Sequence, residues 1–170
     1  GAAPSKAQIQ DAIENWAFTK MKAMPSPLYI IMVDHGSENA FHLGSETVTP
    51  ADLNGWITAL ETKLANAGTG NPDALKENRH AIIGACNSGS FLASLSQSAA
   101  TASQNTGGSG AVGRIIITSA TGIEQSIIGH KTPTSTPGTL VRIGEYFLDA
   151  RFNWLARGQN GREAFRRARD

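Results

Sequence analysis

The sequence lacks several features that mark specialised proteins. Only one of its 170 residues is a cysteine. No disulfide can therefore form within the chain, and cysteine usage leaves the compartment open, with secreted and periplasmic locations included. Gly1-Ala2-Ala3 lacks the charged start and apolar run of a signal peptide. Because no stretch approaches the roughly 20 apolar residues that cross a bilayer, we expect no membrane span.

The charge pattern excludes further classes of partner. The 15 basic and 14 acidic residues give a net charge of +1. The basic residues cluster only near the end of the chain, at Arg162, Arg166, Arg167 and Arg169. We interpret this cluster as favourable charge at the end of a helix, and it argues against nucleic acid as a partner, which needs a coherent basic face. Neither closely paired metal ligands nor a nucleotide fingerprint occurs, so we expect no metal and no cofactor.

Length and apolar periodicity predict one α/β domain over residues 1–170. Ser5 and Thr49 have the form of helix caps, and Asn160 with Glu163 is a variant of the same signal. The expected helices cover 5–22, 49–68, 88–95, 140–155 and 160–169. The expected strands are Leu28–Val33, Ala81–Ala85 and Arg114–Ala120. The alternation of helices and strands along the chain favours a mostly parallel sheet flanked by helices on both sides, a three-layer sandwich.

Further expectations concern burial and loops. The apolar first strand is typical of one buried on both faces, and Trp16, Trp56 and Trp154 lie in apolar helical stripes that we assign to the core. The connections are 34–47, which includes a short hairpin around Phe41, Leu43 and Val48, then 69–78, 96–113 and 129–138. The Ser, Ala, Thr and Gly residues of 96–113 bury little apolar area, so we expect part of that segment to be mobile.

Two strand ends carry the residues that bear chemistry. The first strand runs into Asp34-His35-Gly36-Ser37, and the second runs into Cys86-Asn87-Ser88-Gly89. The carboxyl ends of parallel strands meet at one edge of a sheet, where open α/β folds place their sites. An imidazole beside a thiol there is the arrangement of a cysteine hydrolase. The turn of small residues after Cys86 leaves its sulfur accessible and puts it at the positive end of the next helix.

Each of these residues also has a structural interpretation. A lone cysteine is usually a small buried hydrophobe, and a histidine at a strand end is usually a loop residue. His42, His80 and His130 are weaker candidates, because His80 begins a strand at the opposite end and the other two lie in loops. A zinc site from His35, His42 and Cys86 lacks the closely paired ligands of structural zinc. Taken together, His35 and Cys86 favour the catalytic interpretation.

The two motifs resemble those of the legumain-type cysteine peptidases, which have the caspase-haemoglobinase fold. In that family the histidine lies in Asp-His-Gly-Ser and the nucleophile in Ala-Cys-x-Ser-Gly-Ser, which match residues 34–37 and 85–90 here. The residues Asp52-Leu53-Asn54, Thr118-Ser119-Ala120-Thr121, Glu124 and Ser126 extend the resemblance. It covers residues 28–126, and 158–168 resembles bacterial relatives more loosely.

The resemblance implies an endopeptidase acting on a peptide or protein without metal or cofactor. Cys86 would attack the scissile carbonyl, His35 would protonate the leaving amine, and the N–H groups of Gly36 and Cys86 would hold the oxyanion. Ser119 would line the pocket for the residue before the cut, and Asp34 would lie on the leaving-group side. Ser37 and Gly84 complete the expected substrate-binding set. Gly84 stands where legumains carry the acid that helps to select asparagine, which puts asparagine specificity in doubt.

The chain also departs from the family ahead of its first strand. The family has one or two strands there, with an asparagine that orients the imidazole, whereas this sequence begins with a helix. A fragment, a processed subunit and a reduced fold all fit that difference. Two other functions stay open: an inert caspase-like module that binds a peptide or protein partner, and a sheet domain that binds a small ligand with a structural Cys86.

Overall fold

A parallel sheet of three strands forms the centre of the molecule. The computed structural model describes residues 4–96, 113–127, 131–133, 140–142 and 146–169. The strands are β1 (Leu28–Val33), β5 (Arg79–Gly84) and β6 (Arg114–Thr118), in the order β1-β5-β6. Both pairings are parallel. The first two strands match their predicted positions within two residues, and the third ends two residues early.

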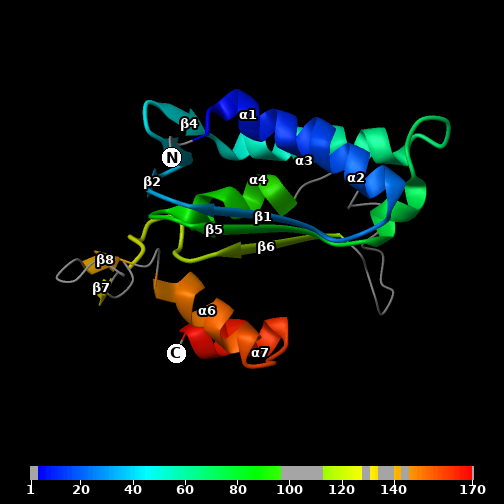
Figure 1. The fold of residues 1–170 in the computed structure, drawn as a ribbon. Helices are drawn as coiled ribbons and strands as arrows, with labels where there is room; N and C mark the ends of the chain where they lie inside the picture. The colour runs from blue at the N-terminus through cyan, green and yellow to red at the C-terminus, as the bar shows by residue number, and fades with distance from the viewer. Residues whose placement is uncertain (1–3, 97–112, 128–130, 134–139, 143–145, 170) are drawn as a thin grey trace.

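Helices cover both faces of this sheet (Figure 1). On one face a continuous helical segment comprises α1 (Lys6–Asp11), the π-helical segment η1 (Ala12–Ala17) and α2 (Phe18–Ala23), and it packs beside α3 (Pro50–Ala65). The opposite face carries α6 (Tyr146–Ala156) and α7 (Gly161–Arg169). The described part of the chain is therefore α/β with a parallel sheet between helices, as expected. Among the described residues, no helix combines the length and apolarity of a membrane span.

Local sequence signals explain where the helices begin. Ser5 and Thr49 both form capping boxes, with Gln8 and Asp52 as their partners. The Asn160 side chain accepts a hydrogen bond of 2.9 Å from the N–H of Glu163, which confirms the third cap. The helix from Thr49 ends at Ala65, before the expected Gly68. A short 3-10 helix, η2 (Pro72–Lys76), lies within the connection that follows.

A buried ion pair network joins the first helical layer to the sheet. Glu61 on α3 accepts a hydrogen bond of 3.1 Å from Arg79 Nε on β5 and one of 2.8 Å from Arg114 Nη2 on β6. The two arginines face each other in register at the start of their strands. All three side chains are almost completely buried, so the network fixes α3 over the amino end of the sheet.

Two small antiparallel sheets lie outside the central one. The segment after β1 forms β2 (Gly36–Ser37), β3 (Ala40–Leu43) and β4 (Glu46–Val48), which confirms the expected hairpin and adds a strand to it. Further along, β7 (Lys131–Pro133) pairs with β8 (Leu140–Arg142). The predicted loop over 129–138 is therefore wrong at 131–133, and the predicted helix start at Leu140 is wrong, because 131–133 and 140–142 form strands.

The burial of β1 differs from the prediction. Tyr29, Ile31 and Val33 are exposed, whereas β5 is buried along most of its length. The apolar cluster of α6 and α7 includes Ile82 and Ile117 but no residue of β1. Within the described structure, α6 and α7 pack against β5 and β6 rather than against β1, so the β1 side chains on that face stay exposed. Trp16 is likewise exposed, whereas Trp56 is buried.

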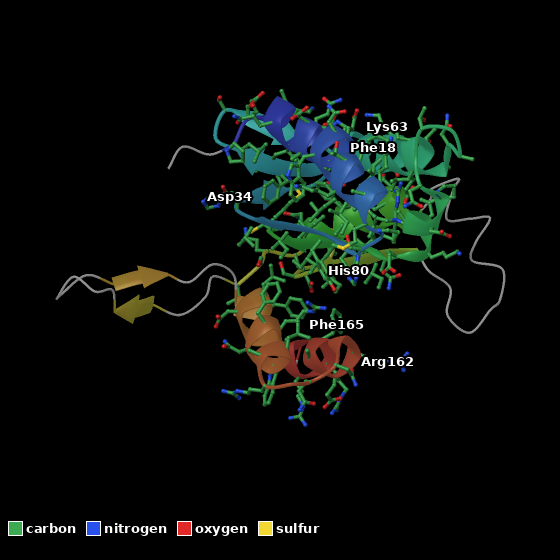
Figure 2. All side chains as sticks on the ribbon, turned by 45° about the vertical axis from the view of Figure 1, so that its right-hand side comes forward. Phe18, Asp34, Lys63, His80, Arg162 and Phe165 are labelled. Carbon is green, nitrogen blue, oxygen red and sulfur yellow. The ribbon has the colours of Figure 1, made fainter. Side chains whose placement is uncertain are left out.

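Two of the three histidines set aside lie away from the carboxyl ends of the strands or outside the described residues. His80 stands near the amino end of β5, opposite the end at which Asp34 lies (Figure 2). His130 lies outside the described residues, as does most of the segment 96–113 that we expected to be mobile.

Candidate functional site

The carboxyl ends of β1 and β5 bring His35 and Cys86 to the same edge of the sheet. Val33 and Gly84 form the last register pair, and the Asp34 N–H donates to the Gly84 carbonyl at 3.3 Å beyond it. His35 and Cys86 each follow by two residues the end of their own strand. The predicted juxtaposition of the two segments is thus present in the backbone. The His35 side chain is exposed and the Cys86 side chain is half-buried.

Gly36 packs directly against the backbone of the cysteine segment. A methyl group at Gly36 would overlap the carbonyl oxygen of Cys86 and would lie 2.9 Å from the Ala85 Cβ. Only glycine allows an approach this close. The absent side chain therefore brings the segment that carries His35 into contact with the one that carries Cys86.

The backbone pairing of β2 and β3 determines which N–H groups are available beside Cys86. The His42 N–H donates to the His35 carbonyl at 2.9 Å. Because bonded pairs alternate along an antiparallel ladder, Gly36 and Phe41 form a non-bonded pair, and the Gly36 N–H points away from β3. The His35 N–H donates to the side-chain carboxylate of the preceding residue, Asp34, at 2.7 Å. The His35 N–H is therefore engaged within the protein, whereas the Gly36 N–H is not bonded to β3.

A hydrogen-bonded link holds the two segments together. The Ser90 hydroxyl donates to the Asn87 carbonyl at 2.7 Å and accepts from the Asn39 N–H at 3.0 Å. Asn39 belongs to the turn after β2, so one serine ties the turn after Cys86 to the hairpin after His35. Sequence inspection did not identify Ser90 as a link, although it lies inside the motif.

The turn after Cys86 is held by the loop that follows β6. Asn87 adopts a left-handed conformation with φ of 56°. Its N–H donates to the Glu124 carbonyl at 2.7 Å, and its side-chain amide donates to the Gly122 carbonyl at 3.0 Å. A side chain on Gly89 would clash with the backbone of Thr121. The helix expected over 88–95 is present, but its first turn is the 3-10 helix η3 (Ser88–Phe91), and the α-helical part, α4 (Leu92–Ser96), has only five residues.

Ser119 lies between this loop and the cysteine segment. Its hydroxyl accepts a hydrogen bond of 3.2 Å from the Ala85 N–H and is 3.2 Å from the Ser126 hydroxyl. Its own N–H donates to the Ile83 carbonyl at 3.0 Å. Ser119, the first residue after β6, is thereby fixed beside Ala85, the residue that precedes Cys86.

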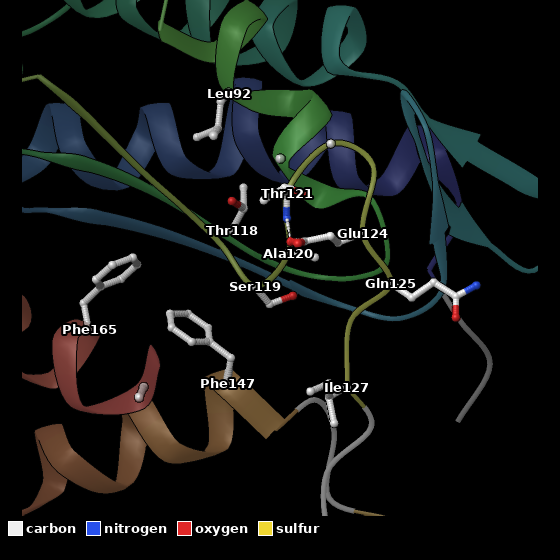
Figure 3. A pocket seen from close by; sticks show the side chains of 13 residues that line it. Leu92, Thr118, Ser119, Ala120, Thr121, Glu124, Gln125, Ile127, Phe147 and Phe165 are labelled. Atoms are coloured by element: carbon white, nitrogen blue, oxygen red, sulfur yellow. Dashed lines mark hydrogen bonds between the residues drawn. The ribbon is translucent and has the colours of Figure 1, made fainter. Parts of the chain in front are cut away.

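A cavity of about 720 Å³ opens on the far side of Ser119, between the loop after β6 and the helices α6 and α7 (Figure 3). Leu92, Phe147 and Phe165 contribute apolar walls, and Glu124 and Ile127 stand on the loop side. The two phenylalanine rings meet edge to face, with centroids 5.3 Å apart. Gly89, three residues after Cys86, is among the lining residues of this cavity.

The remaining candidate residues have less direct places. Ser37 lies on β2, and its hydroxyl is 3.1 Å from Nε2 of His42, so this serine interacts with a histidine that we had set aside. Gly84 is the last residue of β5 and is buried. Within the described part of the chain, no group of three or more His, Cys, Asp or Glu side chains is arranged to hold a metal ion.

No protein-family model matches this sequence, and no curated protein matches it significantly.

Proposed function

We propose that this chain is a cysteine endopeptidase of the legumain-like type, with Cys86 as nucleophile and His35 as general acid and base. The observation that carries the proposal is the packing of Gly36 against the Cys86 backbone. It brings the segments of both residues together at the carboxyl edge of a parallel sheet, which is the usual place for a site in this class of fold.

The proposed reaction is an acyl transfer through a thioester. The Cys86 thiol gives its proton to His35 and its sulfur bonds to the carbonyl carbon of the scissile peptide. The carbon–nitrogen bond then breaks as His35 returns that proton to the leaving amine. Water attacks the thioester, His35 accepts the water proton, and the Cys86 sulfur leaves as the acid product forms.

Backbone groups would stabilise the negative oxygen formed in both steps. The Gly36 N–H points away from β3, and the Gly36 backbone packs against that of Cys86. Together with the Cys86 N–H it would form an oxyanion hole, in which each donor is worth ~3 kcal/mol of transition-state stabilisation. The Asp34 carboxylate accepts a hydrogen bond from the His35 N–H, so the next N–H along the chain, that of Gly36, would serve the substrate.

The resting state does not require a preformed ion pair. Among the described residues, neither the His35 ring nor the Cys86 thiol makes a hydrogen bond, and His35 is exposed. Catalytic hydrogen bonds are often long before substrate arrives and tighten in the complex. A peptide bound between the His35 and Cys86 side chains would tighten these hydrogen bonds.

The test uses a peptide library with three variants of the full chain. Cys86→Ala and His35→Ala should each lower kcat/KM by at least about 100-fold, since loss of a general acid alone costs 10²–10⁴-fold. His42→Ala is the matched control, because it removes a histidine from the same hairpin and should leave activity within about twofold. Cleavage that persists in Cys86→Ala would overturn the proposal.

Thiol labelling separates the enzyme from an inert binding module. Cys86 is the single cysteine of the chain, so alkylation by iodoacetamide reports on it alone. The proposal expects labelling at neutral pH that slows at least tenfold in His35→Ala. Slow labelling that does not respond to His35, combined with no cleavage, would favour a module that binds a peptide or protein partner.

A further inference from the structure

The cavity beside Ser119 gathers large apolar side chains that the fold leaves uncovered. Ile127 is 70% exposed, Leu92 is 43% exposed and Phe165 is 38% exposed, and all three line this cavity. They come from three separate parts of the chain, namely the loop after β6, α4 and α7. Apolar side chains that converge on one concave surface mark a binding site for an apolar group.

The lining of the cavity is mainly apolar, and two of its polar side chains make hydrogen bonds within the protein. The Ser119 hydroxyl is occupied by the Ala85 N–H and the Ser126 hydroxyl. One carboxylate oxygen of Glu124 accepts a hydrogen bond of 3.3 Å from the Thr121 N–H, and the side chain is exposed to solvent. A bound group would therefore be recognised mainly by contact with the apolar walls.

The cavity is continuous with the backbone that carries Cys86. Ser119 is bonded to Ala85, the residue before the cysteine. Gly89, three residues after it, is itself part of the cavity lining and packs closely against Thr121. A peptide whose scissile bond lies at Cys86 could thus place one of its side chains in the cavity.

We infer that this cavity selects substrates by a large apolar side chain, aromatic or long aliphatic, next to the scissile bond. The inference rests on the proposed peptidase function and adds the class of side chain that the site accepts. A volume of about 720 Å³ lies within the ~300–1,000 Å³ range of ligand pockets, so an aromatic ring fits without rearrangement of the walls.

The binding test uses Cys86→Ala protein, so its result does not depend on catalysis. N-acetyl amides of phenylalanine, leucine, asparagine and arginine are titrated against the protein and followed by NMR shifts. The phenylalanine and leucine amides should bind at least about tenfold more tightly than the asparagine amide. If the arginine amide binds most tightly and this binding is lost in Glu124→Gln, the cavity recognises a charged group and the inference is overturned.

A matched pair of loop variants tests whether the cavity itself gives the preference. Ile127→Asp places a charge on the cavity wall and should weaken phenylalanine amide binding about tenfold. Ile123→Asp makes the same change in the same loop at a residue that is 90% exposed and is not part of the lining, so binding should stay within twofold. Equal effects of both variants, or no effect of either, would overturn the inference.

The two hypotheses fail in different ways. If wild-type protein cleaves peptides and Cys86→Ala does not, but cleavage shows no apolar preference, the proposed function stands and the cavity inference falls. If the apolar amides bind and Ile127→Asp weakens them, but the wild-type protein cleaves nothing, the cavity inference stands for a binding module and the peptidase proposal falls.

Discussion

At the scale of single residues, Gly36 is the position where the candidate site is most constrained. Gly36→Ala should lower the free energy of unfolding by about 1–3 kcal/mol, because the added methyl overlaps the Cys86 carbonyl and the packed segments must separate. The same separation should reduce the proposed peptidase activity more than tenfold. Urea denaturation and peptide cleavage measure the two effects.

Gly55→Ala is the control for that substitution. Gly55 lies on α3, and a methyl group there would meet nothing within 4 Å. This variant should gain roughly 0.5–1 kcal/mol, because alanine loses less backbone entropy than glycine in a helix. Equal stability of Gly36→Ala and wild type would contradict the close packing described here.

The sequence predicted which residues form the candidate site, but it did not predict the contacts that hold their segments together. The motif order and the apolar runs before it predicted that the segments of His35 and Cys86 share one edge of a sheet, and the backbone confirms this. The link from Ser90 to Asn39 spans 51 positions. A contact at that distance depends on how the two segments cross in space, and no local pattern encodes it.

At the scale of elements, the Glu61 network joins one helix to two strands. Glu61→Ala should cost about 3–5 kcal/mol of unfolding free energy, because it leaves the guanidinium groups of Arg79 and Arg114 buried beside the lost charge. Thr62→Ala, at the exposed neighbouring position on α3, should change stability by less than about 0.5 kcal/mol. Similar denaturation midpoints for the two variants would contradict this role.

Elements with a strong local signal were predicted well. The helix starts at Ser5, Thr49 and Asn160 follow from side chains that cap the backbone, and such signals need only a few neighbouring residues. The pairing of β7 with β8 was missed because each strand has three residues. A segment that short shows no periodicity by which a strand could be distinguished from a loop.

At the scale of the whole molecule, the two helical layers are unequal. The layer of α1, η1, α2 and α3 shares one apolar cluster with all three strands of the sheet, whereas the cluster of α6 and α7 includes residues of β5 and β6 alone. The apolar sequence of β1 predicted burial on both of its faces, which the structure does not show. Whether a sheet face is covered depends on where helices that are distant in sequence pack, and the sequence of the strand alone does not predict this.

The contact between α6 and the sheet should make stability depend on pH. His80 on β5 stacks on Tyr29 at a centroid distance of 4.2 Å. Its pKa lies below the usual value of 6.5, first because burial disfavours the charged ring and second because the charge of Arg151 on α6 opposes it. Arg151 is itself buried, and its Nε makes no hydrogen bond within the described structure.

The sign of the effect follows from proton linkage. Above pH 6.5 His80 is neutral in both states, so it contributes no pH dependence. As the pH falls below 6.5, the unfolded chain binds a proton at His80 before the folded chain does, and the free energy of unfolding decreases until the folded pKa is passed. Arg151→Met removes one cause of the lowered pKa, so this variant should lose less stability than wild type between pH 7 and pH 5.

Urea denaturation across that range, together with an NMR titration of the His80 ring, measures both consequences. His42→Gln serves as the control, because it removes a histidine from the opposite edge of the sheet and should leave the difference between wild type and Arg151→Met unchanged. A His80 pKa at or above 6.5, or equal pH slopes for wild type and Arg151→Met, would show that the Arg151 charge on α6 does not lower the pKa of His80.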